Sequence, residues 1–147
     1  MNGRCTTDCL PGLLKPLTGT DIPEYTLVSP EDTPPLINWD GQLLEAAVFN
    51  DQLTPALPTA QVLALYENCY YEGTPALIKN TIQKGTVYHY GAAFTEQAAE
   101  VFLEKLDLKT PYEAHFTLPP QCEIAPRTKD GTTYYFILNY SNTPAVI

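Results

Sequence analysis

Basic residues are scarce in this chain. Its 147 residues include 8 Lys and Arg against 17 Asp and Glu, which gives a net charge of −9. Binding to nucleic acid depends on many Lys and Arg contacts with phosphate, so this balance argues against DNA or RNA as a partner. It argues equally against an anionic membrane surface. The acidity instead indicates a well-solvated surface.

Long apolar runs are also missing. No run approaches the roughly 20 residues that span a bilayer, and the N-terminus has one Arg without the apolar segment of a signal peptide. The cysteines, Cys5, Cys9, Cys69 and Cys122, form no Cys-x-x-Cys pair, and Cys5 and Cys9 have no histidine near them. We therefore expect free thiols and no metal site. Free thiols favour a reducing compartment, so the predicted location is cytoplasmic.

Recognisable catalytic motifs are absent from the sequence, which has no Gly-x-Ser-x-Gly, His-Glu-x-x-His, P-loop or Gly-x-Gly-x-x-Gly pattern. Glycoside hydrolysis needs two carboxylates that face each other across a cleft. Glu100 and Glu104 share one face of a predicted helix, but that face is expected to be solvated. Glu67 and Glu72 flank a predicted loop, and nothing in the sequence holds them at a defined separation.

Histidine and tryptophan are nearly absent, with two His and one Trp. Nucleophilic catalysis would need a pair such as Cys69 with His89, and this pairing stays open although no motif supports it. The ten Tyr and five Phe are typical of half-buried strands, yet aromatic rings could also line a sugar-binding face. Trp39, which precedes a turn signal, is the residue that we single out for that alternative.

The first 91 residues predict strands and turns. Prolines in residues 1–35 exclude long helices, and we expect one helical turn at 13–17 and a strand at 24–28. Asp40-Gly41 predicts a hairpin turn. The apolar run at 61–66 predicts a strand that is buried on both faces. The further strands are expected at residues 36–39, 43–49, 75–81 and 85–90, with Asn50-Asp51 ending the second of these.

Residues 95–108 predict a helix with Thr95 as its N-cap. Its apolar face is expected to consist of Ala98, Ala99, Phe102, Leu103 and Leu106. After a boundary within residues 109–120, strands are predicted at 121–126 and 132–139. Asp130-Gly131 would join them, and residues 145–147 would start a further strand.

Four segments together resemble glycoside hydrolase family 42 β-galactosidases. Residues 71–77 (Tyr-Glu-Gly-Thr-Pro-Ala-Leu), Asn80 and residues 84–90 (Lys-Gly-Thr-Val-Tyr-His-Tyr) resemble a family run of aromatic-x-Gly-x-Pro-Ala-apolar, Asn, a Gly-Lys-Gly-like turn and an aromatic strand. Gln83 replaces the first Gly of that turn. The other similar segments, in the family's order, are residues 62–66 before this run, residues 134–140 with Thr143-Pro144 after it, and residues 8–12 near the start.

The resemblance implies an α+β or α/β fold. Residues 1–110 would form part of an amidotransferase-like (flavodoxin-like) trimerisation domain, a sheet with a flanking helix. Residues 111–147 would begin a small antiparallel β domain. Family members hold their two catalytic glutamates in a separate barrel, so the resemblance carries no catalytic residue and no cofactor onto this chain.

The expected function is therefore a non-catalytic structural and oligomerisation portion of a β-galactosidase. The expected partners are further copies of the chain and the catalytic barrel of the parent enzyme. The strand at 61–66 is expected to be buried on both faces, but only one helix is predicted to cover the sheet, and an uncovered sheet face or open edge recruits a partner. A stand-alone sugar-binding or protein-interaction module is the main alternative. A small enzyme of unrecognised type, built around His89, is another.

Overall fold

A computed structural model describes residues 9–110, 112 and 115–147. The chain divides into two compact units, Met1–Phe102 and Leu103–Ile147. The division between residues 110 and 111 that the sequence suggested stays a prediction. No helix among the described residues is long and apolar enough to cross a membrane.

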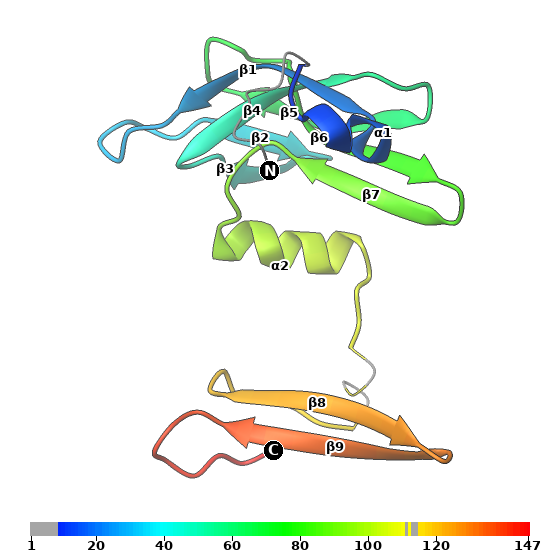
Figure 1. The fold of residues 1–147 in the computed structure, drawn as a ribbon. Coiled ribbons are helices and arrows are strands. Elements are labelled where there is room, and N and C mark those ends of the chain that lie inside the picture. Colours follow the sequence, from blue (N-terminus) through cyan, green and yellow to red (C-terminus); the bar gives the residue numbers. More distant parts are fainter. Residues whose placement is uncertain (1–8, 111, 113–114) are drawn as a thin grey trace, which may run out of the picture. The chain divides into compact units, whose positions relative to one another are not determined.

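The first unit is built around a five-stranded sheet with the order β3-β2-β5-β6-β7, in which every neighbouring pair is antiparallel (Figure 1). A second, two-stranded sheet pairs β1 with β4, also antiparallel. The strand bounds are β1 Thr20–Leu27, β2 Leu36–Trp39, β3 Gln42–Glu45, β4 Phe49–Pro55, β5 Ala60–Glu67, β6 Pro75–Ile82 and β7 Gly85–Tyr90.

The predicted α/β, flavodoxin-like class is wrong, because the fold is mostly antiparallel β. Parallel neighbours need a crossover of about a dozen or more residues, usually a helix. Each connection between successive strands in the first unit is shorter than that, so the chain can only turn back on itself. The Asp40-Gly41 turn between β2 and β3 is of this kind, with positive φ at both residues as a tight hairpin requires.

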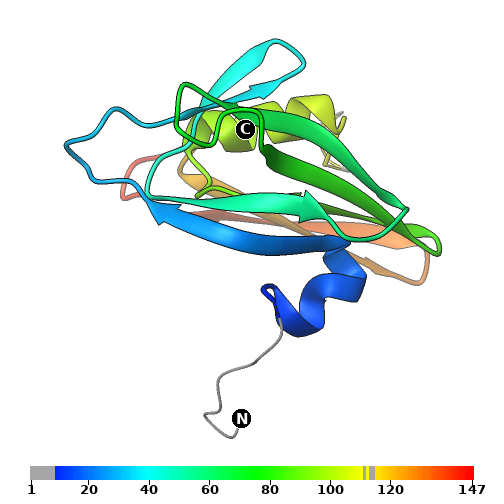
Figure 2. The ribbon, with the colours of Figure 1, turned by 90° about the horizontal axis from the view of Figure 1, so that it is seen from above.

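The core of the first unit lies on both sides of the five-stranded sheet. On one side, Ile22 of β1 and Leu53 of β4 pack with Ile78 of β6. On the other side, the ring of Phe102 in α2 (Glu96–Lys105) contacts Trp39 and Tyr90, with ring centroids 4.8 and 5.2 Å apart. Figure 2 shows the β1–β4 ribbon and the strands of the larger sheet from above.

Two strand predictions fail in detail. β5 is not buried on both faces, because Val62 and Leu65 remain 41% and 40% exposed and irregular pairing interrupts its ladder with β6. The predicted strand at 43–49 is two strands, with a break at residues 46–48 where Val48 adopts a φ of 70°. Asn50 and Asp51 do not end a strand but lie within β4.

Helix α2 begins as predicted, since the Thr95 hydroxyl accepts a hydrogen bond of 3.1 Å from the backbone N–H of Ala98. Its buried residues are Ala98, Val101 and Phe102, whereas Leu103 is exposed. The predicted apolar face is therefore only partly correct. It omitted Val101, which the helical repeat also brings to this side.

Among its described residues, the second unit contains an antiparallel hairpin, β8 (Cys122–Lys129) with β9 (Thr132–Asn139). Its turn is Asp130-Gly131, again with positive φ at both residues, as the sequence predicted. No strand forms at 145–147, contrary to expectation. The strands expose large apolar side chains on β9, namely Tyr134, Phe136, Ile137 and Leu138.

Candidate functional site

The short helical segment before β1 presents a leucine surface, defined by Leu10, Leu13, Leu14 and Leu17. All four side chains are exposed, and Leu13 is 96% exposed. The segment consists of a 3₁₀ turn, η1 (Gly12–Leu14), and a one-turn helix, α1 (Lys15–Thr18). It matches the helical turn predicted at 13–17.

Contacts at the end of α1 hold this segment firmly on the sheet. Asn80 of β6 donates a hydrogen bond of 2.9 Å from Nδ2 to the carbonyl oxygen of Leu17. The helix ends at Gly19 with a φ of 70°, and a Cβ there would lie 2.7 Å from Cγ of Asn80. Only glycine combines this left-handed conformation with so close an approach. The leucines are therefore exposed on an anchored element.

Two hollows of the first unit, of about 460 and 340 Å³, lie beside the leucine surface and at the tip of the β1–β4 ribbon. Beside the leucine surface, the hollow of about 460 Å³ is lined by Cys9, Gly12, Leu13, Lys15, Pro16 and Leu57. Soluble monomers rarely expose contiguous apolar surface of this kind, and where they do it commonly marks a protein interface. The leucine surface is thus the first candidate for an interaction site.

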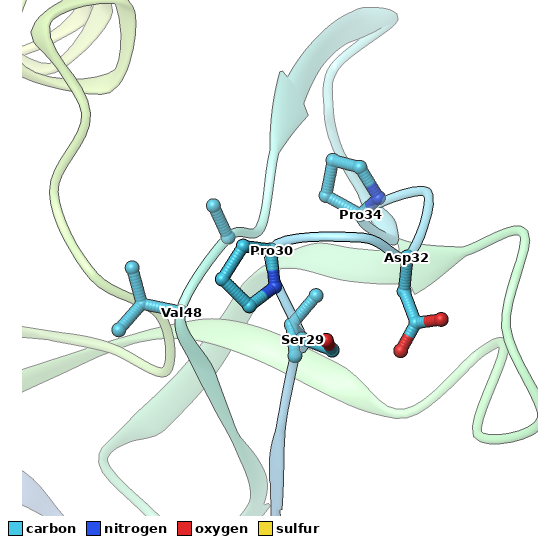
Figure 3. A pocket seen from close by; sticks show the side chains of 7 residues that line it. Ser29, Pro30, Asp32, Pro34 and Val48 are labelled. Atoms are coloured by element: carbon cyan, nitrogen blue, oxygen red, sulfur yellow. The ribbon is translucent and has the colours of Figure 1, made fainter.

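The tip of the β1–β4 ribbon carries the second hollow, shown in Figure 3. Its lining is Val28, Ser29, Pro30, Asp32, Pro34, Ala47 and Val48, and its volume is about 340 Å³. Val48 is exposed and has a positive φ, which is a genuine outlier for a β-branched residue. Such backbone strain persists only where surrounding contacts impose it. Here the Val48 carbonyl accepts the N–H of Val28 at 2.9 Å.

A buried polar junction joins the two sheets. The hydroxyl of Thr20 in β1 and Nδ1 of His89 in β7 are 2.6 Å apart, and Thr20 also donates to the Thr18 hydroxyl at 2.9 Å. Burial lowers the pKa of His89, and the nearby Asp51 carboxylate opposes this effect. Burial raises the pKa of Asp51. Because Thr20 is fully buried, this junction is structural rather than an accessible nucleophile and base.

The structure does not bring Cys69 and His89 together as a catalytic pair. His89 is bonded to Thr20, whereas Cys69 interacts with Tyr71. Burial raises the pKa of the Cys69 thiol, which reduces the reactive thiolate at neutral pH. Cys9, Cys69 and Cys122 are free, as the sequence predicted, and Cys5 lies outside the described residues.

The carboxylates that the sequence singled out have separate surroundings. Glu67 accepts a hydrogen bond of 2.6 Å from Nδ2 of Asn38, and Glu72 accepts one of 3.2 Å from the backbone N–H of Asn68. Glu100 and Glu104 are exposed on α2. Over residues 9–110, 112 and 115–147, no group of three or more His, Cys, Asp or Glu side chains is arranged to hold a metal ion.

Trp39 is not a surface residue. It is only 4% exposed, and its ring packs edge-on against Phe102. The hypothesis that Trp39 forms a sugar-binding face is therefore wrong. One exposed aromatic residue that sequence reasoning missed is Tyr70, which is 74% exposed. The Asn-Cys-Tyr-Tyr run at 68–71 held no signal that distinguished Tyr70 from its buried neighbour Tyr71.

Similarity to known proteins links these features to one enzyme family. A model of the β-galactosidase trimerisation domain matches residues 1–110. The chain is 29% identical over 133 residues to β-galactosidase LacA of Lactobacillus acidophilus, covering 90% of this chain and 20% of the relative. It is 27% identical over 135 residues to β-galactosidase BgaP of a Planococcus species, with the same coverage of each.

Solved structures give the same result. The β-galactosidase of Bacillus circulans sp. alkalophilus matches with a TM-score of 0.72 and 25% identity, over 92% of this chain and 21% of that one. The cold-adapted β-galactosidase of Rahnella sp. R3 matches with a TM-score of 0.68 and 25% identity, over 93% and 21%. The chain spans about a fifth of the length of these relatives. With three quarters of its residues matched by the family model, the chain belongs to the β-galactosidase trimerisation domain family.

Proposed function

We propose that this chain is a non-catalytic structural and oligomerisation portion of a β-galactosidase. The parent enzyme would hydrolyse terminal β-galactosides at glutamates on a catalytic barrel that contacts this chain. Residues 1–110 would form the part that self-associates, and residues 111–147 would begin a separate β domain. The family description, which names trimerisation, supports the assignment.

The leucine surface is the observation that carries this proposal. Its four exposed side chains lie on an element fixed to the sheet by the Asn80–Leu17 hydrogen bond. Burying a leucine side chain is worth roughly 1.5–3 kcal/mol relative to leaving it in water. Contact between copies through this surface would remove several such side chains from water at little ordering cost, because the segment is already held in place.

Size-exclusion chromatography with light scattering tests the association. We expect the 147-residue chain to form a homo-oligomer, and the double variant Leu13→Ser/Leu14→Ser to shift it toward monomer. Leu43→Ser is the matched control, because Leu43 is an exposed leucine on β3 outside this surface. A wild-type chain that stays monomeric throughout the micromolar range would refute the oligomerisation proposal.

Hydrolysis of nitrophenyl galactoside tests the non-catalytic part. We expect no turnover by the isolated chain, because Glu67 and Glu72 accept hydrogen bonds from different residues, and Glu100 and Glu104 are exposed on α2, whereas hydrolysis needs two carboxylates that face each other across a cleft. Turnover that a single Glu→Gln change abolishes would show that the chain holds its own active site.

A further inference from the structure

A groove of about 350 Å³ lies between the loop that follows β1 and the loop that follows β5. Its lining includes Asp32 and Thr33 from the first loop and Asn68, Tyr70 and Tyr71 from the second. This groove is distinct from the leucine surface, which belongs to the η1–α1 segment. The oligomerisation proposal, which rests on the leucine surface, does not depend on it.

The ring of Tyr70 forms an exposed wall that is nevertheless fixed in orientation. Its hydroxyl donates to Oε1 of Glu24 at 3.0 Å and lies 2.8 Å from the Thr26 hydroxyl. Its ring meets Tyr71 edge-on, with centroids 4.7 Å apart and planes at 90°. A 74% exposed aromatic side chain would ordinarily sample several rotamers, and these contacts hold it in one.

Tyr71 connects this wall to the interior. Its hydroxyl accepts a hydrogen bond of 2.8 Å from Nδ2 of the fully buried Asn50. Its ring also packs edge-on against Tyr66, with centroids 5.0 Å apart. A chain of three tyrosines thus runs from the core to the groove, and the exposed ring at its end is preorganised.

Polar side chains in the groove have unused hydrogen-bonding capacity. Among the described residues, the carboxylate of Asp32 and the side chains of Asn68 and Thr33 make no hydrogen bond. Asp32 lines both this groove and the neighbouring hollow at the ribbon tip that Figure 3 shows. A carboxylate accepts, an amide both donates and accepts, and a hydroxyl does both.

We propose that this groove binds a pyranose sugar. One face of a pyranose presents C–H groups that stack on an aromatic ring, and its edge carries hydroxyls that donate and accept. Tyr70 would stack on the apolar face, while Asp32, Thr33 and Asn68 would bond the hydroxyls. A free carboxylate disfavours an anionic ligand by like-charge repulsion, so a neutral saccharide fits better than a phosphate or an acidic peptide.

The test is a titration of the ¹⁵N-labelled 147-residue chain with lactose, followed by NMR chemical shifts. We expect saturable shifts at the amides of Asp32, Asn68 and Tyr70. Tyr70→Ala should weaken binding by about tenfold, as loss of an aromatic contact commonly does. Tyr25→Ala is the matched control, because Tyr25 is an exposed tyrosine on β1 that does not line the groove, and it should bind as the wild type does.

Sorbitol distinguishes stacking from nonspecific polyol effects, since it has hydroxyls but no ring face. Saturation by lactose but not by sorbitol supports the proposal, and equal responses to both contradict it. If Tyr70→Ala loses its circular dichroism signal, Asp32→Ala replaces it and should weaken lactose binding severalfold. Absence of saturable shifts with folded wild type would overturn the inference, and it would leave the oligomerisation proposal unaffected because the light-scattering test is independent.

Discussion

Tyr66→Phe should destabilise the first unit by removing one buried hydroxyl and nothing else. The Tyr66 side chain is fully buried, and its hydroxyl points at two backbone carbonyls, those of Gly91 at 2.7 Å and Asp51 at 3.1 Å. It therefore ties β5 to the start of β4 and to the end of β7. Phe keeps the ring, including its edge contact with Tyr71.

The expected loss follows from what remains after the change. Leaving a buried acceptor without its donor costs about 1–3 kcal/mol. The Gly91 carbonyl keeps a second donor, the backbone N–H of Asp51 at 2.6 Å, so the loss should lie in the lower part of that range. We expect about 1–2 kcal/mol, or a fall in melting temperature of roughly 5 °C per kcal/mol for a unit of this size.

Urea denaturation followed by circular dichroism measures this loss directly. Tyr25→Phe serves as the control, because Tyr25 is exposed and its hydroxyl has no hydrogen bond among the described residues. That variant should change the free energy of unfolding by less than about 0.5 kcal/mol. If Tyr66→Phe were as stable as Tyr25→Phe, the hydroxyl would contribute nothing, and the assignment of Tyr66 as a clamp between strands would be wrong.

Three further changes probe the same unit. Gly91→Ala should destabilise more than Tyr66→Phe, because a Cβ at Gly91 would overlap the Asp51 carbonyl oxygen and lie 2.9 Å from the Tyr66 hydroxyl; thermal melts compare the two variants. Burial lowers the pKa of His89 in the folded state, so as pH falls below about 6.5 His89 is protonated in the unfolded chain before it is protonated in the folded chain. The stability due to neutral His89 should therefore be lost as pH falls toward the lowered pKa. The melting temperature of His89→Gln should depend less on pH between pH 7.5 and 5.5 than that of the wild type. Thr95→Ala should cost about 1 kcal/mol by removing the cap on Ala98, whereas Thr95→Ser should cost much less, as amide hydrogen exchange in α2 would show.

Local features were predictable where a few neighbouring residues determine the conformation. Asp40-Gly41 and Asp130-Gly131 each fix a tight hairpin, because these residue types tolerate positive φ at both central positions. Thr95 caps α2 because its hydroxyl reaches an N–H only three residues along the chain. The strand prediction was wrong for residues 43–49, because this segment can form either one continuous strand or two short ones. Backbone hydrogen bonds with Pro35 and Val28 stabilise the break between the two strands.

For the candidate sites as well, contacts between distant segments decided what the local sequence could not predict. Sequence reasoning favoured Trp39 for its rarity, yet packing against Phe102 buried it. Tyr70 looked like any of the ten tyrosines, and only its bonds to Glu24 and Thr26 make it a fixed, exposed ring. The hypothesis that Cys69 and His89 form a catalytic pair is wrong, because the two side chains interact with different residues.

By itself, the sequence determined the acidic character, the free thiols, the strand-rich N-terminal part and, through ordered similar segments, the family. Tertiary structure alone decided the order of the strands and their division between two sheets in the first unit, that β5 exposes one face, and that the leucines of η1 and α1 face solvent. The physical reason is range. Turns and caps depend on residues close together in the chain, whereas strand order, burial and the partners of a side chain depend on contacts between segments far apart in sequence.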